Sequence, residues 1–132
     1  MRKIETNTLL SSLWLFVLLN IVFRDIHQLV LKSELEMLLT GTYNGVEITE
    51  RLMLLGGIMV QVPIGMVLFS LLLTRRIGRP ITFVAVLVTA SGLLSAAPTD
   101  MDDMLHLVIE LAAMAAIAWT AWTWPKRDMS HP

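Results

Sequence analysis

Residues 52–73, LMLLGGIMVQVPIGMVLFSLLL, are the stretch of sequence that decides the fold. The stretch contains no charged residue, and a helix of this length crosses the ~30 Å hydrocarbon core of a bilayer at about 1.5 Å per residue. A helix also satisfies its backbone N–H and C=O groups within one segment, as that core requires. The stretch therefore predicts a transmembrane helix. We expect this helix to begin at about Glu50, with Thr49 as its N-cap, and to end at Thr74.

Three further apolar stretches predict membrane spans of their own. The four predicted spans cover about residues 8–31, 50–74, 81–97 and 103–124. Between the first two, Ser33 and Glu36 match a capping box, which predicts a short helix to about Thr40 that Gly41 ends. Between the second and third, residues 75–80 predict a tight basic turn.

The amino-acid composition agrees with a membrane protein. Hydrophobic residues make up 55% of the chain and the mean hydropathy is +0.69, which is too apolar for a soluble domain with a charged surface. We therefore predict an all-α integral membrane bundle of four transmembrane helices, with residues 1–132 as a single domain. We expect this bundle to contact membrane lipids and allow for a homo-oligomer.

Basic residues gather at one end of the predicted spans. The side of the termini holds Arg2, Lys3, Arg75, Arg76, Arg79, Lys126 and Arg127. Only Arg24, Lys32 and Arg51 remain for the opposite side. Because cytoplasmic loops carry the excess of Lys and Arg, we expect both termini to be cytoplasmic.

Several classes of function are excluded or unsupported. The chain contains no cysteine, which removes disulfides, thiol redox chemistry and iron–sulfur clusters. No basic stripe with interleaved aromatic residues is present, so we expect no nucleic-acid partner. The sequence suggests no cofactor.

The most informative polar residues lie in the predicted fourth span. Asp103, His106 and Glu110 stand at i, i+3 and i+7 and therefore share one helix face, with Asp102 one turn from His106. Glu110 lies about 10 Å deeper than Asp103. A carboxylate at that depth must be hydrated, paired or protonated, which marks it as a candidate functional residue.

The first span offers partners for this face. Asn20, Arg24 and His27 fall on one helix face, and Asp25 lies beside it at a depth similar to that of Glu110. The second span adds Glu50 and Arg51 at the rim and Gln61 near mid-membrane. We expect these residues to line one outward-facing pocket in which Asp25, Asp103, His106 and Glu110 are the candidate catalytic groups.

Each of these residues also has a purely structural interpretation. Arg24 with Asp25 or Glu110 forms an ion pair that lets two helices pack, and an interfacial histidine often only hydrogen-bonds a neighbouring acid. Gln61 satisfies carbonyls freed by Pro63. Glu34, Glu36 and Glu47 are expected on a solvated loop face.

Two resemblances concern particular motifs. Over nearly its whole length the chain resembles an uncharacterised family of small four-helix bacterial membrane proteins, on Asp25-Ile26-His27, Gln61-Val62-Pro63-Ile64 and Asp102-Asp103 with His106 and Glu110. This resemblance implies a fold but no established activity. We expect the protein in a bacterial inner membrane. Separately, His106-Leu107-Val108-Ile109-Glu110 resembles the His-x-x-x-Glu segment of emopamil-binding sterol isomerases, which implies acid–base chemistry on a lipid.

Three functions remain open. The first is the binding or acid–base processing of a lipid-like small molecule in the outward pocket. The second is a small transporter or a proton- or metal-binding protein working as a dimer. His27, Asp25, His106 and Glu110 include ligands suitable for zinc, but no dense motif is present and we assign no metal site. The third is a non-catalytic membrane subunit that docks a partner through its acidic outer loops.

Overall fold

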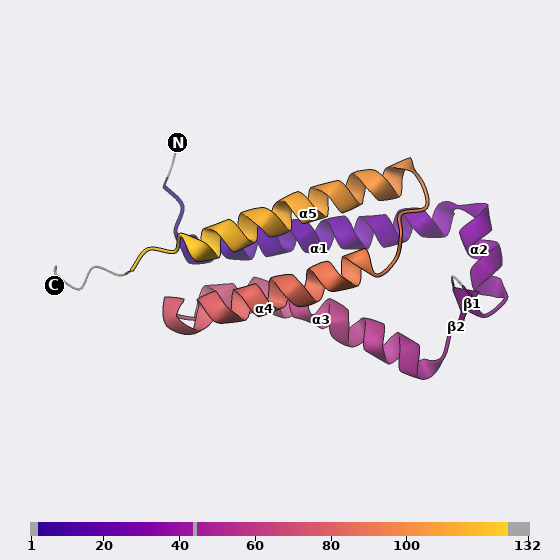
Figure 1. Ribbon diagram of the computed structural model, residues 1–132, viewed down its shortest axis with the longest axis horizontal. Coiled ribbons are helices and arrows are strands. Elements are labelled where there is room, and N and C mark those ends of the chain that lie inside the picture. The colour runs from indigo at the N-terminus through magenta and orange to yellow at the C-terminus, as the bar shows by residue number, and fades with distance from the viewer. Residues whose placement is uncertain (1–2, 44, 127–132) are drawn as a thin grey trace.

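The computed structural model of the protein describes residues 3–43 and 45–126, which form five helices and a short hairpin (Figure 1). In chain order these are α1 (Thr6–Val30), α2 (Lys32–Leu39), β1 (Thr42–Tyr43), β2 (Val46–Glu47), α3 (Glu50–Leu72), α4 (Arg75–Leu94) and α5 (Met101–Trp122). The four helices other than α2 are long and apolar enough to cross a membrane. The predicted all-α fold class with four such helices is confirmed.

The four long helices alternate in direction (Figure 1). α1 packs against α3 and α5, and α4 packs against the same two helices. The described chain begins and ends at one end of the bundle, while α2 and the antiparallel β1–β2 hairpin lie at the other (Figure 1). We refer to these as the terminal end and the hairpin end.

The buried core lies toward the terminal end. Its members are Leu10, Trp14, Val17, Met66, Ala85, Ala113, Met114, Ile117 and Trp124. By contrast, all residues from Glu50 to Ile58, the hairpin-end part of α3, are exposed. The hairpin end of the bundle is therefore less tightly packed than the terminal end.

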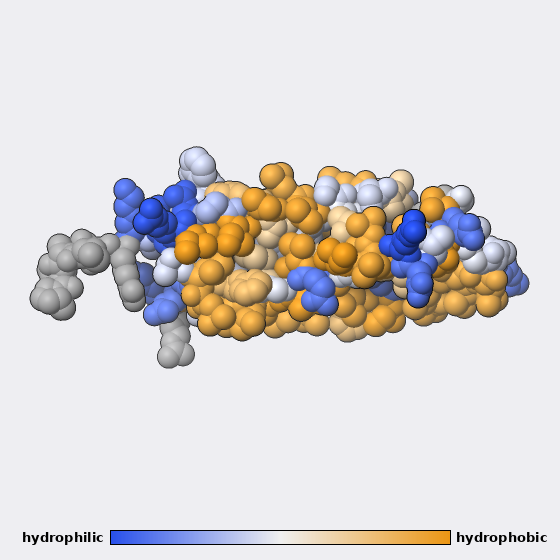
Figure 2. Space-filling model, turned by 90° about the horizontal axis from the view of Figure 1, so that it is seen from below, coloured by the Kyte–Doolittle hydropathy of each residue, from blue (hydrophilic) through white to orange (hydrophobic). Residues whose placement is uncertain are grey.

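The outer surface divides into zones along the bundle. Figure 2 shows hydrophobic side chains covering the middle of the face in view, with hydrophilic residues gathered at both ends. Leu54, Leu68, Val84, Leu87 and Val108 are among the large apolar side chains that are more than half exposed. Hydrocarbon solvates such a surface better than water does.

Polar contacts fasten the helices at the terminal end. Asn7 Nδ2 donates to the carbonyl oxygens of Ser70 at 2.8 Å and Leu73 at 3.1 Å, in the last turn and at the C-cap of α3. Arg75 Nε donates to the carbonyl oxygen of Trp124 at 2.7 Å, and Arg79 Nε to that of Ala121 at 2.9 Å. Carbonyls at a helix end lack the usual donor four residues on, and these side chains add hydrogen bonds to them.

Helices α1, α3 and α5 begin and end within about two residues of the first, second and fourth predicted spans, whereas α4 differs from the third. The predicted turn at residues 75–80 is helical, because the Thr74 carbonyl accepts hydrogen bonds from both Ile77 and Gly78 and starts α4 there. Pro80 lies in the second turn of α4, where its missing N–H costs the helix one backbone hydrogen bond. The third predicted span, 81–97, is thus observed as Arg75–Leu94.

The predicted capping residues had mixed outcomes. Thr49 caps α3 as predicted, since its hydroxyl accepts from the N–H of Leu52 at 3.2 Å. The helix predicted from Ser33 is present as α2, but its N-cap is Leu31 and no side chain caps it. Glu36 instead lies 3.6 Å from the Lys32 ammonium. Of the basic residues used to predict topology, Arg2 and Arg127 lie outside the described residues.

Gly78 is required by the packing of α4 against the chain after α5. A Cβ at this position would lie 2.9 Å from Cη2 of the buried Trp124 ring. We expect Gly78→Ala to lower the free energy of unfolding by about 1–3 kcal/mol through overpacking. Thermal unfolding in detergent measures the effect. Gly57→Ala is the control, because a Cβ there meets nothing within 4 Å, and equal destabilisation of both variants would contradict the role of Trp124.

Candidate functional site

Arg24 links α1 to α5 in the hairpin-end half of the bundle. Its Nε donates to Asp103 Oδ1, and its Nη1 donates to Glu110 Oε2 at 3.2 Å. Asp103 is 4% exposed and Glu110 is 0% exposed. The seven-residue spacing of the two acids places both carboxylates on the face of α5 that meets α1.

This arrangement satisfies the electrostatic requirement of a buried carboxylate. An uncompensated charge in a low-dielectric interior is costly, and the guanidinium offers fixed donors to both acids. Glu110 Oε1, however, has no hydrogen-bond partner among the described residues. Glu110 is therefore closed off from solvent in the interface between α1 and α5, and its Oε1 atom accepts no hydrogen bond from a described residue.

Local hydrogen bonds at the start of α5 hold Asp103 in place. Asp100 is the N-cap, and its Oδ1 accepts from the N–H of Asp103 at 2.8 Å. Asp103 Oδ2 in turn accepts from the N–H of Thr99 at 2.9 Å. Acidic residues in a first turn also suit the helix dipole. The Asp100-Met101-Asp102-Asp103 segment thus begins the helix and positions one carboxylate for Arg24.

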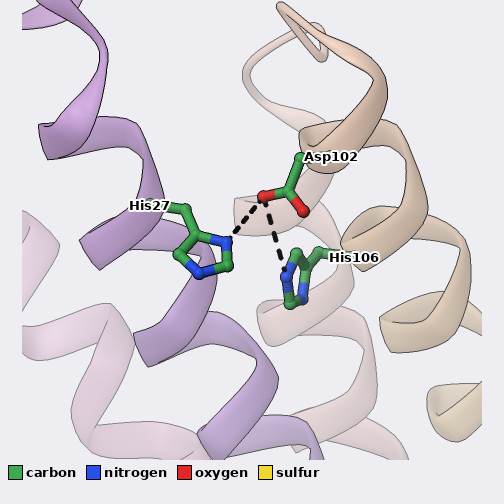
Figure 3. A group of neighbouring side chains, drawn as sticks. All are labelled: His27, Asp102 and His106. Carbon is green, nitrogen blue, oxygen red and sulfur yellow. Dashed lines mark hydrogen bonds and ion pairs between the residues drawn. The ribbon is translucent and has the colours of Figure 1, made fainter.

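A second group lies beside the Arg24 pairs and consists of His27, Asp102 and His106 (Figure 3). His27 Nδ1 is 2.8 Å from Asp102 Oδ2, and His106 Nε2 is 3.8 Å from the same oxygen. The two imidazole rings meet edge to face with their centroids 5.7 Å apart. Asn20 Oδ1 lies 3.3 Å from His106 Nδ1. The predicted faces of the first and fourth spans therefore do meet.

A cavity of about 420 Å³ lies on a different side of Arg24, between α1, α3 and α4. Polar side chains line part of it, namely Arg24, Asp25, Gln28, Tyr43, Thr89, Ser95, Thr99 and Asp103. The remainder is mostly apolar, with Ile21, Met59, Val60, Pro63 and Leu93 in the wall. Because one wall combines charge with an apolar remainder, the cavity is suited to an amphipathic molecule.

Thr89 gives this cavity an unsatisfied polar group. Its side chain lies on α4 and is 6% exposed, and Oγ1 has no hydrogen-bond partner in the described part of the chain. Buried hydroxyls are nearly always hydrogen-bonded, so an orphaned one calls for an explanation. Because Thr89 also lines the cavity, a polar atom bound there would lie near this hydroxyl.

The residues that were expected to line one pocket lie in several different parts of the structure. Asp25 and Asp103 line the cavity, whereas His106 and Glu110 do not. Gln61 lines a second, nearly apolar cavity of about 420 Å³ between α3 and α4. Glu50 and Arg51 are exposed at the start of α3 and line neither of these two cavities. The position of each residue along its helix was predictable, but its neighbours on other helices were not.

Sequence reasoning missed the hairpin-end contributions to the site. No residue of the hairpin was predicted to belong to the site, yet Tyr43 lines the cavity. Burial raises the pKa of the Tyr43 phenol, and the nearby Glu34 carboxylate adds to the increase, so the hydroxyl remains a neutral donor. Glu34 was expected on a solvated face but is 6% exposed. The available sequence signal for this contribution was that the chain's single tyrosine lies in the short connection between α2 and α3.

The Arg24 pairs should dominate the stability of the α1–α5 interface. We expect Arg24→Met to lower the free energy of unfolding by about 3–5 kcal/mol, because Glu110 is then left buried without a counter-charge. The double variant Arg24→Met/Glu110→Met should recover part of this loss. Thermal unfolding in detergent of both single variants and the double variant measures the coupling. Simple additivity of the two single losses would contradict the pairing.

Comparison with known proteins identifies a family. No curated protein and no solved structure matches the chain. The model of the Family of unknown function (DUF6326) matches residues 2–131. This match agrees with the expected membership of an uncharacterised family and does not bear on the resemblance to sterol isomerases. Since the match covers nearly the whole sequence, the chain belongs to the family of unknown function DUF6326.

Proposed function

We propose that the protein is a multi-pass membrane protein that binds a lipid-like, amphipathic small molecule in the cavity between α1, α3 and α4. The observation that carries the proposal is the pairing of a mostly apolar cavity of about 420 Å³ with an orphaned buried hydroxyl, Thr89 Oγ1. Ligand pockets typically combine apolar walls with a few polar groups that orient the ligand.

Membrane insertion is supported by the four long helices and by the apolar surface around the middle of the bundle. Both termini are proposed to be cytoplasmic, because Lys3, Arg75, Arg76, Arg79 and Lys126 gather at the terminal end. The cavity then lies toward the outer leaflet, with Tyr43 of the hairpin among its lining residues.

The polar lining of the cavity suggests the chemistry of the head group. Arg24 is occupied by Asp103 and Glu110. Asp25 makes no hydrogen bond or ion pair with any residue in 3–43 or 45–126 and lines the cavity. A carboxylate without a partner favours a ligand that carries an amine or hydroxyl group, while the apolar wall accommodates a hydrocarbon body.

The same geometry favours binding over proton transfer from Glu110. A general acid must come within hydrogen-bond distance of the atom that it protonates. Glu110 is fully buried in the α1–α5 interface and does not line the cavity. Two acids line the cavity, Asp25 and Asp103, and Asp103 is paired with Arg24. Any acid–base chemistry on a ligand there would therefore fall to Asp25, and Glu110 would act through Arg24.

The proposed orientation can be tested by cysteine labelling. Because the chain contains no cysteine, a cysteine introduced at Lys3 or at Glu47 is the single site in that variant that a maleimide labels. A membrane-impermeant maleimide should label Glu47→Cys in intact cells and label Lys3→Cys only after lysis. The reverse pattern would overturn the orientation, and labelling of neither variant in lysed cells would show that the sites are blocked and that the proposed exposure is wrong.

Ligand binding can be tested with two neighbouring glycines of α3. Gly56 lines the cavity and Gly57 does not, and a Cβ at either position meets nothing within 4 Å. Gly56→Leu should fill the cavity, whereas Gly57→Leu should leave it open. Native mass spectrometry of the detergent-purified proteins should find a co-purifying molecule on the original chain and on Gly57→Leu but not on Gly56→Leu.

Two further results bear on the same proposal. Asp25→Asn and Thr89→Val should each reduce the bound fraction, because each removes a polar partner of the head group. The proposal fails if the original chain and Gly56→Leu carry the same molecule in equal amounts, or if the original chain carries none after mild extraction.

A further inference from the structure

Three potential metal ligands converge where α1 and α5 meet near the hairpin end. His27 comes from α1, and Asp102 and His106 come from successive turns of α5, with the three side chains pointing toward one another (Figure 3). One ligand atom from each lies within 4.8 Å of the other two. Imidazole nitrogen and carboxylate oxygen are ligands that zinc and similar divalent ions prefer.

The distances are close to those around a bound metal ion. Ligand atoms on a tetrahedral zinc, bonded at about 2.0–2.1 Å, lie about 3.4 Å from one another. The Asp102 Oδ2 distances to His27 Nδ1 and His106 Nε2 are 2.8 and 3.8 Å, on either side of that value. His27 and Asp102 are about half exposed, so small side-chain rotations can bring all three atoms to bonding distance.

Asn20 fixes the tautomer of His106. The Asn20 Nδ2 atom donates to the carbonyl oxygen of Phe16 at 2.9 Å. This leaves Asn20 Oδ1 to face His106 Nδ1 at 3.3 Å. Nδ1 therefore carries the proton, and the lone pair of Nε2 points toward Asp102. Metal-bound histidines are usually oriented in this way, by a hydrogen bond from the ring nitrogen that does not bind the metal.

This tautomer places two acceptors against each other. The His106 Nε2 lone pair faces an Asp102 oxygen at 3.8 Å, and the contact is favourable only with a proton or a cation between them. The neighbouring charges also favour a cation. Arg24 has three carboxylates near it, those of Asp25, Asp103 and Glu110, which one guanidinium cannot neutralise, and Asp102 adds its own charge beside His27.

We propose that His27 Nδ1, Asp102 Oδ2 and His106 Nε2 bind one Zn²⁺ ion, with Asn20 orienting His106. Three protein ligands leave one coordination position for water, which the exposure of His27 and Asp102 allows. The site uses none of the residues that line the cavity. Zinc binding and small-molecule binding can therefore succeed or fail independently.

The test is a titration of the full-length chain with Zn²⁺ alone. The protein is purified in detergent through a tag that contains no histidine, stripped with a chelator and titrated by calorimetry. One ion should bind per chain. His106→Ala, Asp102→Asn and His27→Gln should each weaken binding at least tenfold, and Asn20→Leu should weaken it by a smaller factor. Glu36→Gln, which removes an acid at the same end of the bundle but outside the group, should bind as the original chain does.

His27→Gln keeps the test decisive if the other variants fold poorly, because the His27 side chain is 52% exposed and is not part of the buried core. Cobalt substitution supplies an independent readout, since the visible absorption of Co²⁺ distinguishes a four-coordinate site with nitrogen ligands from a hydrated ion. The proposal is overturned if no saturable binding occurs, if His27→Gln binds Zn²⁺ as tightly as the original chain, or if Glu36→Gln loses binding equally.

Discussion

The ion pairs of Arg24 are the constraint on which the hairpin-end half of the bundle depends. A helix pair in hydrocarbon can carry charge only where the charge is matched, and Arg24 matches Asp103 and Glu110 at once. The contact sets the register between α1 and α5. With Arg24 fixed, His27 falls on one side of the contact and meets α5, while Asp25 falls on the other and lines the cavity. Two chemically different sites thus share one structural support.

The bundle therefore has two ends of different character. The terminal end holds the apolar core and the polar contacts that fasten α3 and α5, whereas the hairpin end holds the cavity and the histidine group. A well-packed half is a rigid platform, and binding groups are most precisely held when such a platform supports them. Both proposals place ligands at the end where α3 is least packed.

Sequence reasoning succeeded where the information is local and failed where it is tertiary. Apolar length predicted the four long helices, and the spacing of Asp103, His106 and Glu110 predicted their common face, because both follow from the repeat of a single helix. Gln61 was expected in the same pocket, but its helix turns it toward α4. The burial of Glu34 was equally inaccessible, since it depends on how α2 folds back beside the hairpin. No spacing within one helix contains that information.

Arg75 and Arg79 have a consequence for how substitutions at the terminal end must be interpreted. These arginines contribute to the charge bias from which the orientation is inferred, and their guanidinium groups also complete the hydrogen bonds of the carbonyls at the end of α5. In the proposed orientation, the charges that would direct membrane insertion and the donors of a contact in the folded state therefore belong to the same guanidinium groups. Moving these charges to the other end of the bundle would alter insertion and helix termination together, so a loss of protein after such a change does not distinguish the two causes. Lysine at either position separates them, because it keeps the charge and loses the planar guanidinium geometry.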